Sequence, residues 1–128
     1  MLNFREFQAG PDPFGRSFQV LMKWMQTAIS IRHSDTVDVR FLLRGGDEPT
    51  EKTVAMQHVD LLKLSRETGH EMTDAWCSRL AAAHLLFLIE TGEDLEKDLV
   101  TVSYQQLLGY AAAVAQEEKT AVSNSRTA

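Results

Sequence analysis

Cysteine is nearly absent from this sequence. The 128-residue chain contains one, Cys77, so no disulfide can form within it, which is typical of a reducing compartment. Long apolar runs are missing too: Leu85 to Ile89, for example, is far shorter than the about 20 residues that a membrane-spanning helix needs. Residues 1–10 lack the continuous apolar stretch of a secretory signal. We therefore expect a cytoplasmic protein that does not associate with membranes.

Positive charge is also scarce. The chain has 13 Lys and Arg against 18 Asp and Glu, which gives a formal net charge of −5. An acidic surface has the wrong sign for neutralising phosphates, so we expect no nucleic-acid partner. Gly45 and Gly46 are followed by acidic residues and Pro49, without the Lys and Ser or Thr of a nucleotide-binding loop. No nucleotide cofactor is expected either.

The remaining composition is that of an ordinary globular protein. Apolar residues make up 44% of the chain and charged residues 24%, and the length suits one domain with a real core. We expect a single α+β domain over residues 1–116. Residues 117–128 are polar and small, and this composition predicts a disordered tail.

Three segments have the alternating pattern of strands. The pattern covers about residues 27–33, 37–44 and 51–57, and the connections contain the turn residues Ser, Asp, Gly and Pro. We predict a three-stranded antiparallel meander that needs helices to cover one face.

The first two of these strands also have a predicted register. Keeping the apolar residues on one face places Ile31 opposite Val39 and Ile29 opposite Phe41. The same register places Arg32 opposite Asp38, where the two could form an ion pair across the strands.

Residues 16–26 fit two templates. Phe18, Leu21, Met22 and Met25 follow helical spacing, whereas Phe18, Val20, Met22 and Trp24 alternate as in a strand. The content of Leu, Met, Lys and Gln favours a helix, because these side chains lose little rotamer freedom there. We expect a helix, and the strand remains the alternative.

Helical periodicity dominates the second half of the chain. It predicts helices over about residues 59–68, 73–90 and 103–116. Gly69 and Gly92 supply the C-terminal caps of the first two, and Thr73 or Asp74 caps the start of the second. Ser103 and Gln106 have the spacing of a capping box for the third.

The end of the helix over residues 73–90 is apolar on all sides. A helix of this kind is either the centre of a core or part of a subunit interface. We therefore take Leu85, Leu86, Leu88 and Ile89 as candidate interface residues of a homodimer.

Cys77 and His84 lie on one face of the same helix. Their separation of seven residues is a rise of roughly 10 Å, whereas zinc bonds its ligands at about 2.0–2.3 Å. One ion cannot bind both, so we expect two buried residues and no metal site.

Polar residues gather at the tip of the predicted hairpin. Arg32, His33, Asp35 and Asp38 offer donors, acceptors and one group that titrates near neutrality, as a ligand-binding site would. The same residue types are also common in turns for backbone reasons.

These patterns support two functional hypotheses. The first is a non-catalytic interaction or regulatory module that self-associates through its apolar helical surface. The alternative is a small enzyme or ligand-binding protein that uses the polar cluster at residues 32–38. The first hypothesis is favoured, because the sequence contains no convincing catalytic constellation.

Overall fold

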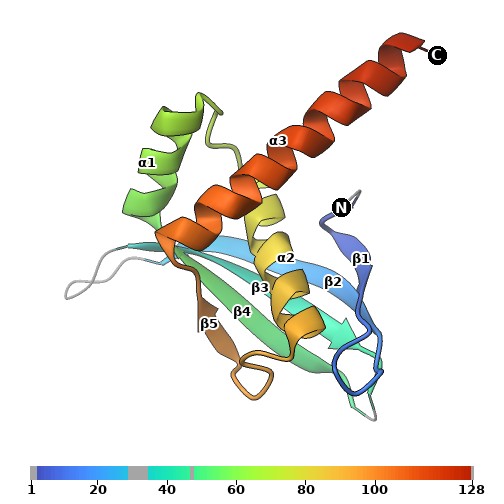
Figure 1. Cartoon of the computed structure of the whole chain (residues 1–128). Helices are drawn as coiled ribbons and strands as arrows, with labels where there is room; N and C mark the ends of the chain where they lie inside the picture. The colour runs from blue at the N-terminus through green and yellow to red at the C-terminus, as the bar shows by residue number, and fades with distance from the viewer. Residues whose placement is uncertain (1–2, 29–34, 47, 128) are drawn as a thin grey trace.

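The computed structural model describes residues 3–28, 35–46 and 48–127, with side chains described as far as Thr120. Figure 1 shows one sheet with helices packed against it. The strands are β1 (Glu6–Ala9), β2 (Phe18–Ala28), β3 (Thr36–Arg44), β4 (Thr50–Gln57) and β5 (Leu99–Thr101). The helices are α1 (His58–Thr68), α2 (Asp74–Thr91) and α3 (Tyr104–Thr127).

The predicted α+β class, with a meander and C-terminal helices, is confirmed. The strand order is β1-β2-β3-β4-β5, and the first four strands form an antiparallel meander. β5 is parallel to β4, and α1 and α2 make the crossover between them. The sheet therefore has two strands more than the sequence predicted.

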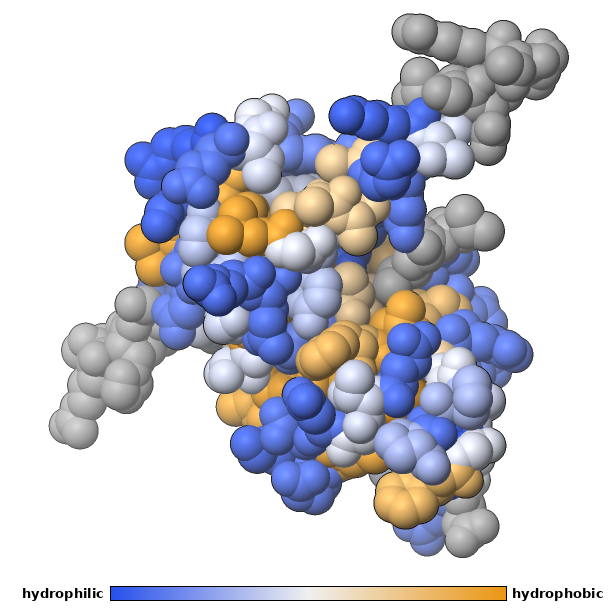
Figure 2. All heavy atoms as spheres, viewed as in Figure 1, coloured by the Kyte–Doolittle hydropathy of each residue, from blue (hydrophilic) through white to orange (hydrophobic). Residues whose placement is uncertain are grey.

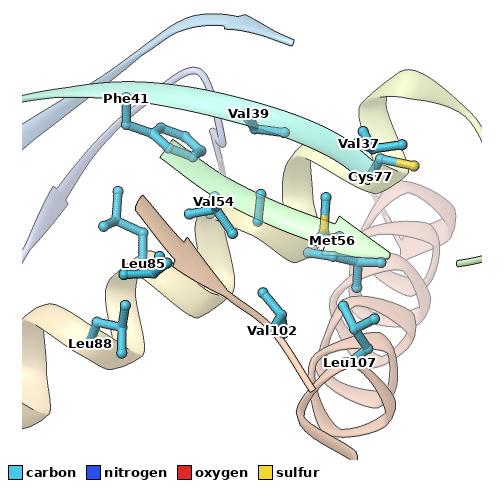
Figure 3. Close-up of a cluster of buried hydrophobic side chains, with 14 of the residues drawn as sticks. Val37, Val39, Phe41, Val54, Met56, Cys77, Leu85, Leu88, Val102 and Leu107 are labelled. Carbon is cyan, nitrogen blue, oxygen red and sulfur yellow. The ribbon is translucent and has the colours of Figure 1, made fainter. Parts of the chain in front are cut away.

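One face of the sheet is covered and the other is open. Along β3 the side chains alternate between fully buried and partly exposed, as expected for a sheet covered on one side. Figure 3 shows the buried side chains of the sheet, such as Phe41 and Val54, pointing toward Leu85 and Leu88 of α2. On the open face, Trp24 of β2 pairs with Arg40 of β3.

The helix ends follow the predicted chemistry. Thr73 caps α2 by accepting a hydrogen bond from the Trp76 amide at 3.1 Å, and Gly92 ends the helix at a φ of 77°. Ser103 and Gln106 form a reciprocal capping box at the start of α3, with distances of 3.0 and 3.1 Å. Local signals therefore define these helix ends.

The prediction of a helix over residues 16–26 is wrong. Residues 18–26 belong to the eleven-residue strand β2, which pairs with β1 on one side and β3 on the other. An irregularity in the pairing between Met22 and Trp24 breaks the alternation. Ladder pairing with two neighbours outweighs the small helix propensity of the segment.

The predicted register of the hairpin is also wrong. Val39 lies opposite Met25, Phe41 opposite Met22, and Asp38 opposite Gln26. The partners expected for them, Ile31, Ile29 and Arg32, lie outside the described residues. The error follows from the interpretation of residues 16–26, because β2 begins at Phe18, well before residue 27.

α3 is longer than its predicted span. It continues to Thr127, past the expected end at Gln116 and through the segment 117–127 for which the composition predicts disorder. The run from Ala111 to Lys119 is rich in Ala, Gln, Glu and Lys, which are strong helix formers. Figure 1 shows the C-terminal half of α3 extending beyond the rest of the molecule.

Candidate functional site

A groove runs between α2 and α3 on the outside of the molecule. Its volume is about 230 Å³, and it has apolar walls with charged residues at its edges. The lining residues are Arg79, Ala83, Leu86, Phe87 and Glu90 of α2 and Ala113, Val114 and Glu117 of α3. Figure 2 shows hydrophobic surface over both α2 and the middle of α3 on this side of the molecule.

The groove exists because α2 has two apolar faces. One face is buried against the sheet and includes Leu80, Leu85 and Leu88. The second face carries Leu86, which is partly buried, and Phe87, which is 36% exposed. α3 covers only part of this second face, so a channel is left between the two helices.

A polar cluster lies beside one end of the groove and connects three segments. His70, in the connection between α1 and α2, hydrogen-bonds through Nε2 to Glu118 Oε1 of α3 at 3.0 Å. Arg79 of α2 donates to the same oxygen at 3.2 Å. The His70 ring also stacks on Trp76, with the ring centroids 5.1 Å apart. This cluster holds α3 against α2 where the groove begins.

Both ring nitrogens of His70 face acceptors. Nδ1 lies 2.8 Å from the Glu71 carbonyl oxygen, and Nε2 faces the Glu118 carboxylate. Only the protonated ring can donate to both. Burial lowers the pKa of His70, but the hydrogen bonds to Glu71 and Glu118 outweigh burial, and the net pKa is raised.

The four candidate interface residues divide into two groups. Leu85, Leu88 and Ile89 are 0–2% exposed and pack in the core of their own chain, where a second copy cannot reach them. Leu86 points the other way and lines the groove. The apolar run at the end of α2 mainly fills the interior, and one residue of it reaches the surface site.

Of the four residues predicted to bind a ligand at the hairpin tip, the structure describes Asp35 and Asp38. Arg32 and His33 lie outside the described residues. The Asp35 backbone carbonyl accepts a hydrogen bond from the His58 amide at 2.8 Å. Asp38 lies on the open face of the sheet, where it accepts a hydrogen bond from the Thr36 hydroxyl at 2.8 Å.

Cys77 and His84 are buried, as predicted. Burial, together with the charge of Asp74, raises the pKa of the Cys77 thiol to about 11, so the thiol stays protonated and unreactive near neutral pH. His84 Nδ1 lies 2.8 Å from the Tyr110 hydroxyl of α3, and burial lowers the pKa of this histidine. Both residues are part of the interior.

Within residues 3–28, 35–46 and 48–127, no three His, Cys, Asp or Glu side chains are arranged to hold one metal ion. No helix in the same part of the chain has the length and hydropathy of a membrane span.

No protein-family model, no curated protein and no solved structure matches this chain. The geometry of the groove is therefore the main indication of what the protein does.

The sequence does contain a pattern for the groove, but the core residues of the same helix make it hard to recognise. Arg79, Ala83, Leu86 and Glu90 recur at intervals of four, three and four residues on the face of α2 opposite its core stripe. Leu85, Leu88 and Ile89 lie in the same segment but on the core side. The sequence alone therefore indicates a helix that is apolar on all sides. The link between His70 and Glu118 has no local signal, because the two residues are far apart in the chain.

Proposed function

We propose that this protein is a non-catalytic interaction module that self-associates through the groove between α2 and α3. The groove itself carries the proposal: its walls are apolar, and its edges carry Arg79 at one end of α2 and Glu90 at the other. Concave apolar surface rimmed by charge is typical of sites that bind another protein. The partner that we propose is a second copy of the same chain.

The C-terminal half of α3 supports this choice. Among the described side chains of α3, Val114 is the last that is buried, and those after it, as far as Thr120, are partly or fully exposed. Glu118 ties this segment to His70 and Arg79, but the exposed turns around it gain little from packing, and short helical segments with little packing are only marginally stable in water. A second copy seated against the groove would pack against this segment and stabilise it.

The size of a stable interface gives further support. Specific protein interfaces bury about 1,200–2,000 Å² in total, which is more than a groove of this volume offers alone. A dimer that also uses the exposed turns of α3 between Val114 and Thr120 would bury more surface than the groove alone. Two such helix pairs would form a four-helix arrangement, a common way for helical hairpins to dimerise.

The test is sedimentation velocity over a range of concentrations. We expect the wild-type chain to dimerise and Phe87→Glu to be monomeric, because the substitution places a charge on the groove wall. Leu62→Glu on α1 is the matched control: Leu62 is 40% exposed and Phe87 is 36% exposed, but Leu62 lies outside the groove. This control should dimerise like the wild type.

Two results would overturn the proposal. One is a wild-type chain that is monomeric up to about 100 μM, where association would contribute only about 5.5 kcal/mol. The other is a dimer that Phe87→Glu and Leu62→Glu leave equally unchanged.

A further inference from the structure

We propose that α2 pairs antiparallel with α2 of a second copy about a two-fold axis. In this arrangement Arg79 of one copy faces Glu90 of the other, and Ala83 faces Leu86. The inference rests on the self-association proposed above and specifies its geometry.

The four residues form one row on the outer face of α2. Their spacing of four, three and four residues keeps them on one side of a helix with 3.6 residues per turn. The same spacing places side chains in the seam between paired helices. All four line the groove.

The row can pair with the same row of a second copy that runs in the opposite direction. The interval pattern is the same read from either end, so an antiparallel copy brings each position opposite another member of the row. A two-fold interface requires this property, because the same patch is used on both copies. The axis then passes between Ala83 and Leu86, and it places a small side chain opposite a large one at each of two symmetric contacts.

The charges at the ends of the row also fit. Arg79 is 40% exposed and uses one guanidinium nitrogen for Glu118, which leaves further N–H donors available. Glu90 is exposed and, within the part of the chain that the structure describes, makes no hydrogen bond or ion pair. The antiparallel copy brings an Arg79 to each Glu90 and so gives this carboxylate a partner.

The residues beside the row are compatible with close approach. Ala83 on α2 and Ala113 on α3 are small, so the backbones of neighbouring helices can come near one another. Phe87 lies next to Leu86 and is 36% exposed, which leaves it free to cover the second copy near the axis. In each copy, α3 forms the outer wall of the groove.

The experiment uses charge reversal and mixing. In an Arg79→Glu homodimer both end contacts become Glu against Glu, and in a Glu90→Arg homodimer both become Arg against Arg. We expect each variant alone to dimerise at least about tenfold more weakly than the wild type, because like charges face each other across the interface. When the two variants are mixed, every end contact pairs opposite charges again, so a heterodimer of near wild-type affinity should form.

Mixing controls for damage to the fold. Arg79→Glu also removes the bond to Glu118, but the mixture contains the same damaged copy, so recovery on mixing cannot come from repair of the monomer. Arg66→Glu on α1 makes the same change of charge outside the groove and should leave dimerisation unchanged.

The outcomes separate this inference from the one on which it rests. A dimeric wild type whose affinity is unaffected by either reversal, or whose reversed variants fail to associate on mixing, would overturn the antiparallel pairing and leave self-association standing. A monomeric wild type would overturn both.

Discussion

Lys52 is a buried cation held by the backbone. It lies on β4 and is 5% exposed, and its Nζ donates hydrogen bonds to the carbonyl oxygens of Asp94, Leu95 and Lys97 at 3.4, 2.7 and 2.5 Å. An ammonium group has three N–H donors, so all of them are used. Burial lowers the pKa of Lys52, and the charges of nearby acidic residues act in the opposite direction. Lys52 therefore fixes the connection between α2 and β5.

Replacing this cation gives the first prediction. Lys52→Met keeps most of the side-chain volume but leaves three carbonyl groups without their donor, so we expect a loss of about 2 kcal/mol in the free energy of unfolding. Urea denaturation measures the difference. Lys97→Met is the matched control, because Lys97 pairs with Asp94 of the same connection but is 57% exposed. The control should lose no more than about 0.5 kcal/mol, and equal losses for the two variants would contradict this role of Lys52.

The connection between α1 and α2 is tied to α3 by a single histidine. His70 bonds to the carboxylate of Glu118, and Arg79 shares that carboxylate from α2. The raised pKa of His70 means that the folded protein binds this proton more tightly than the unfolded chain does. The stabilisation is therefore fully present below the ordinary histidine pKa of 6.5 and is lost as the pH rises through the raised value.

The corresponding prediction compares the wild type with His70→Gln. The free energy of unfolding should favour the wild type more at about pH 5.5 than at about pH 8.5, on either side of the ordinary histidine pKa. His84 has a lowered pKa and acts with the opposite sign, since its contribution is lost as the pH falls below 6.5. Both proteins contain His84, so its effect cancels in the difference. A difference that is the same at both pH values would show that the link does not depend on the proton.

Elements with strong local signals could be predicted from the sequence. β3, β4 and the starts of the three helices lie close to their predicted positions, because alternation, capping residues and glycine stops are encoded within a few residues. β2 was missed because residues 16–26 fit two templates, and the choice depends on pairing with distant strands. β5 has three residues, too few for any periodicity to be recognised.

The candidate site was less accessible to sequence analysis than the fold. The sequence indicates that α2 has more apolar surface than one core face needs, but it does not indicate which residues face outward. Leu85 and Leu86 are neighbours of the same type, yet one is fully buried and the other lines the groove. Their assignment depends on how α2 sits on the sheet, which is set by tertiary packing.

At the scale of the whole molecule, two surfaces are candidates for the proposed association. The open face of the sheet exposes Trp24, but it also carries an ion pair between Arg40 and Glu51 at 2.8 Å, so these two charges are already partnered. The groove between α2 and α3 is concave and apolar, and Glu90 at its edge makes no hydrogen bond or ion pair with any described residue. We therefore place the proposed association at the groove and not on the open face of the sheet.

The most direct test is an isotope-filtered NMR experiment on a mixture of labelled and unlabelled protein, which detects contacts between copies only. The proposed pairing predicts intermolecular contacts between the methyl groups of Ala83 and Leu86, with Phe87 close to both copies. Intermolecular contacts from Trp24 and Leu42 on the open face of the sheet, with none from α2, would contradict it.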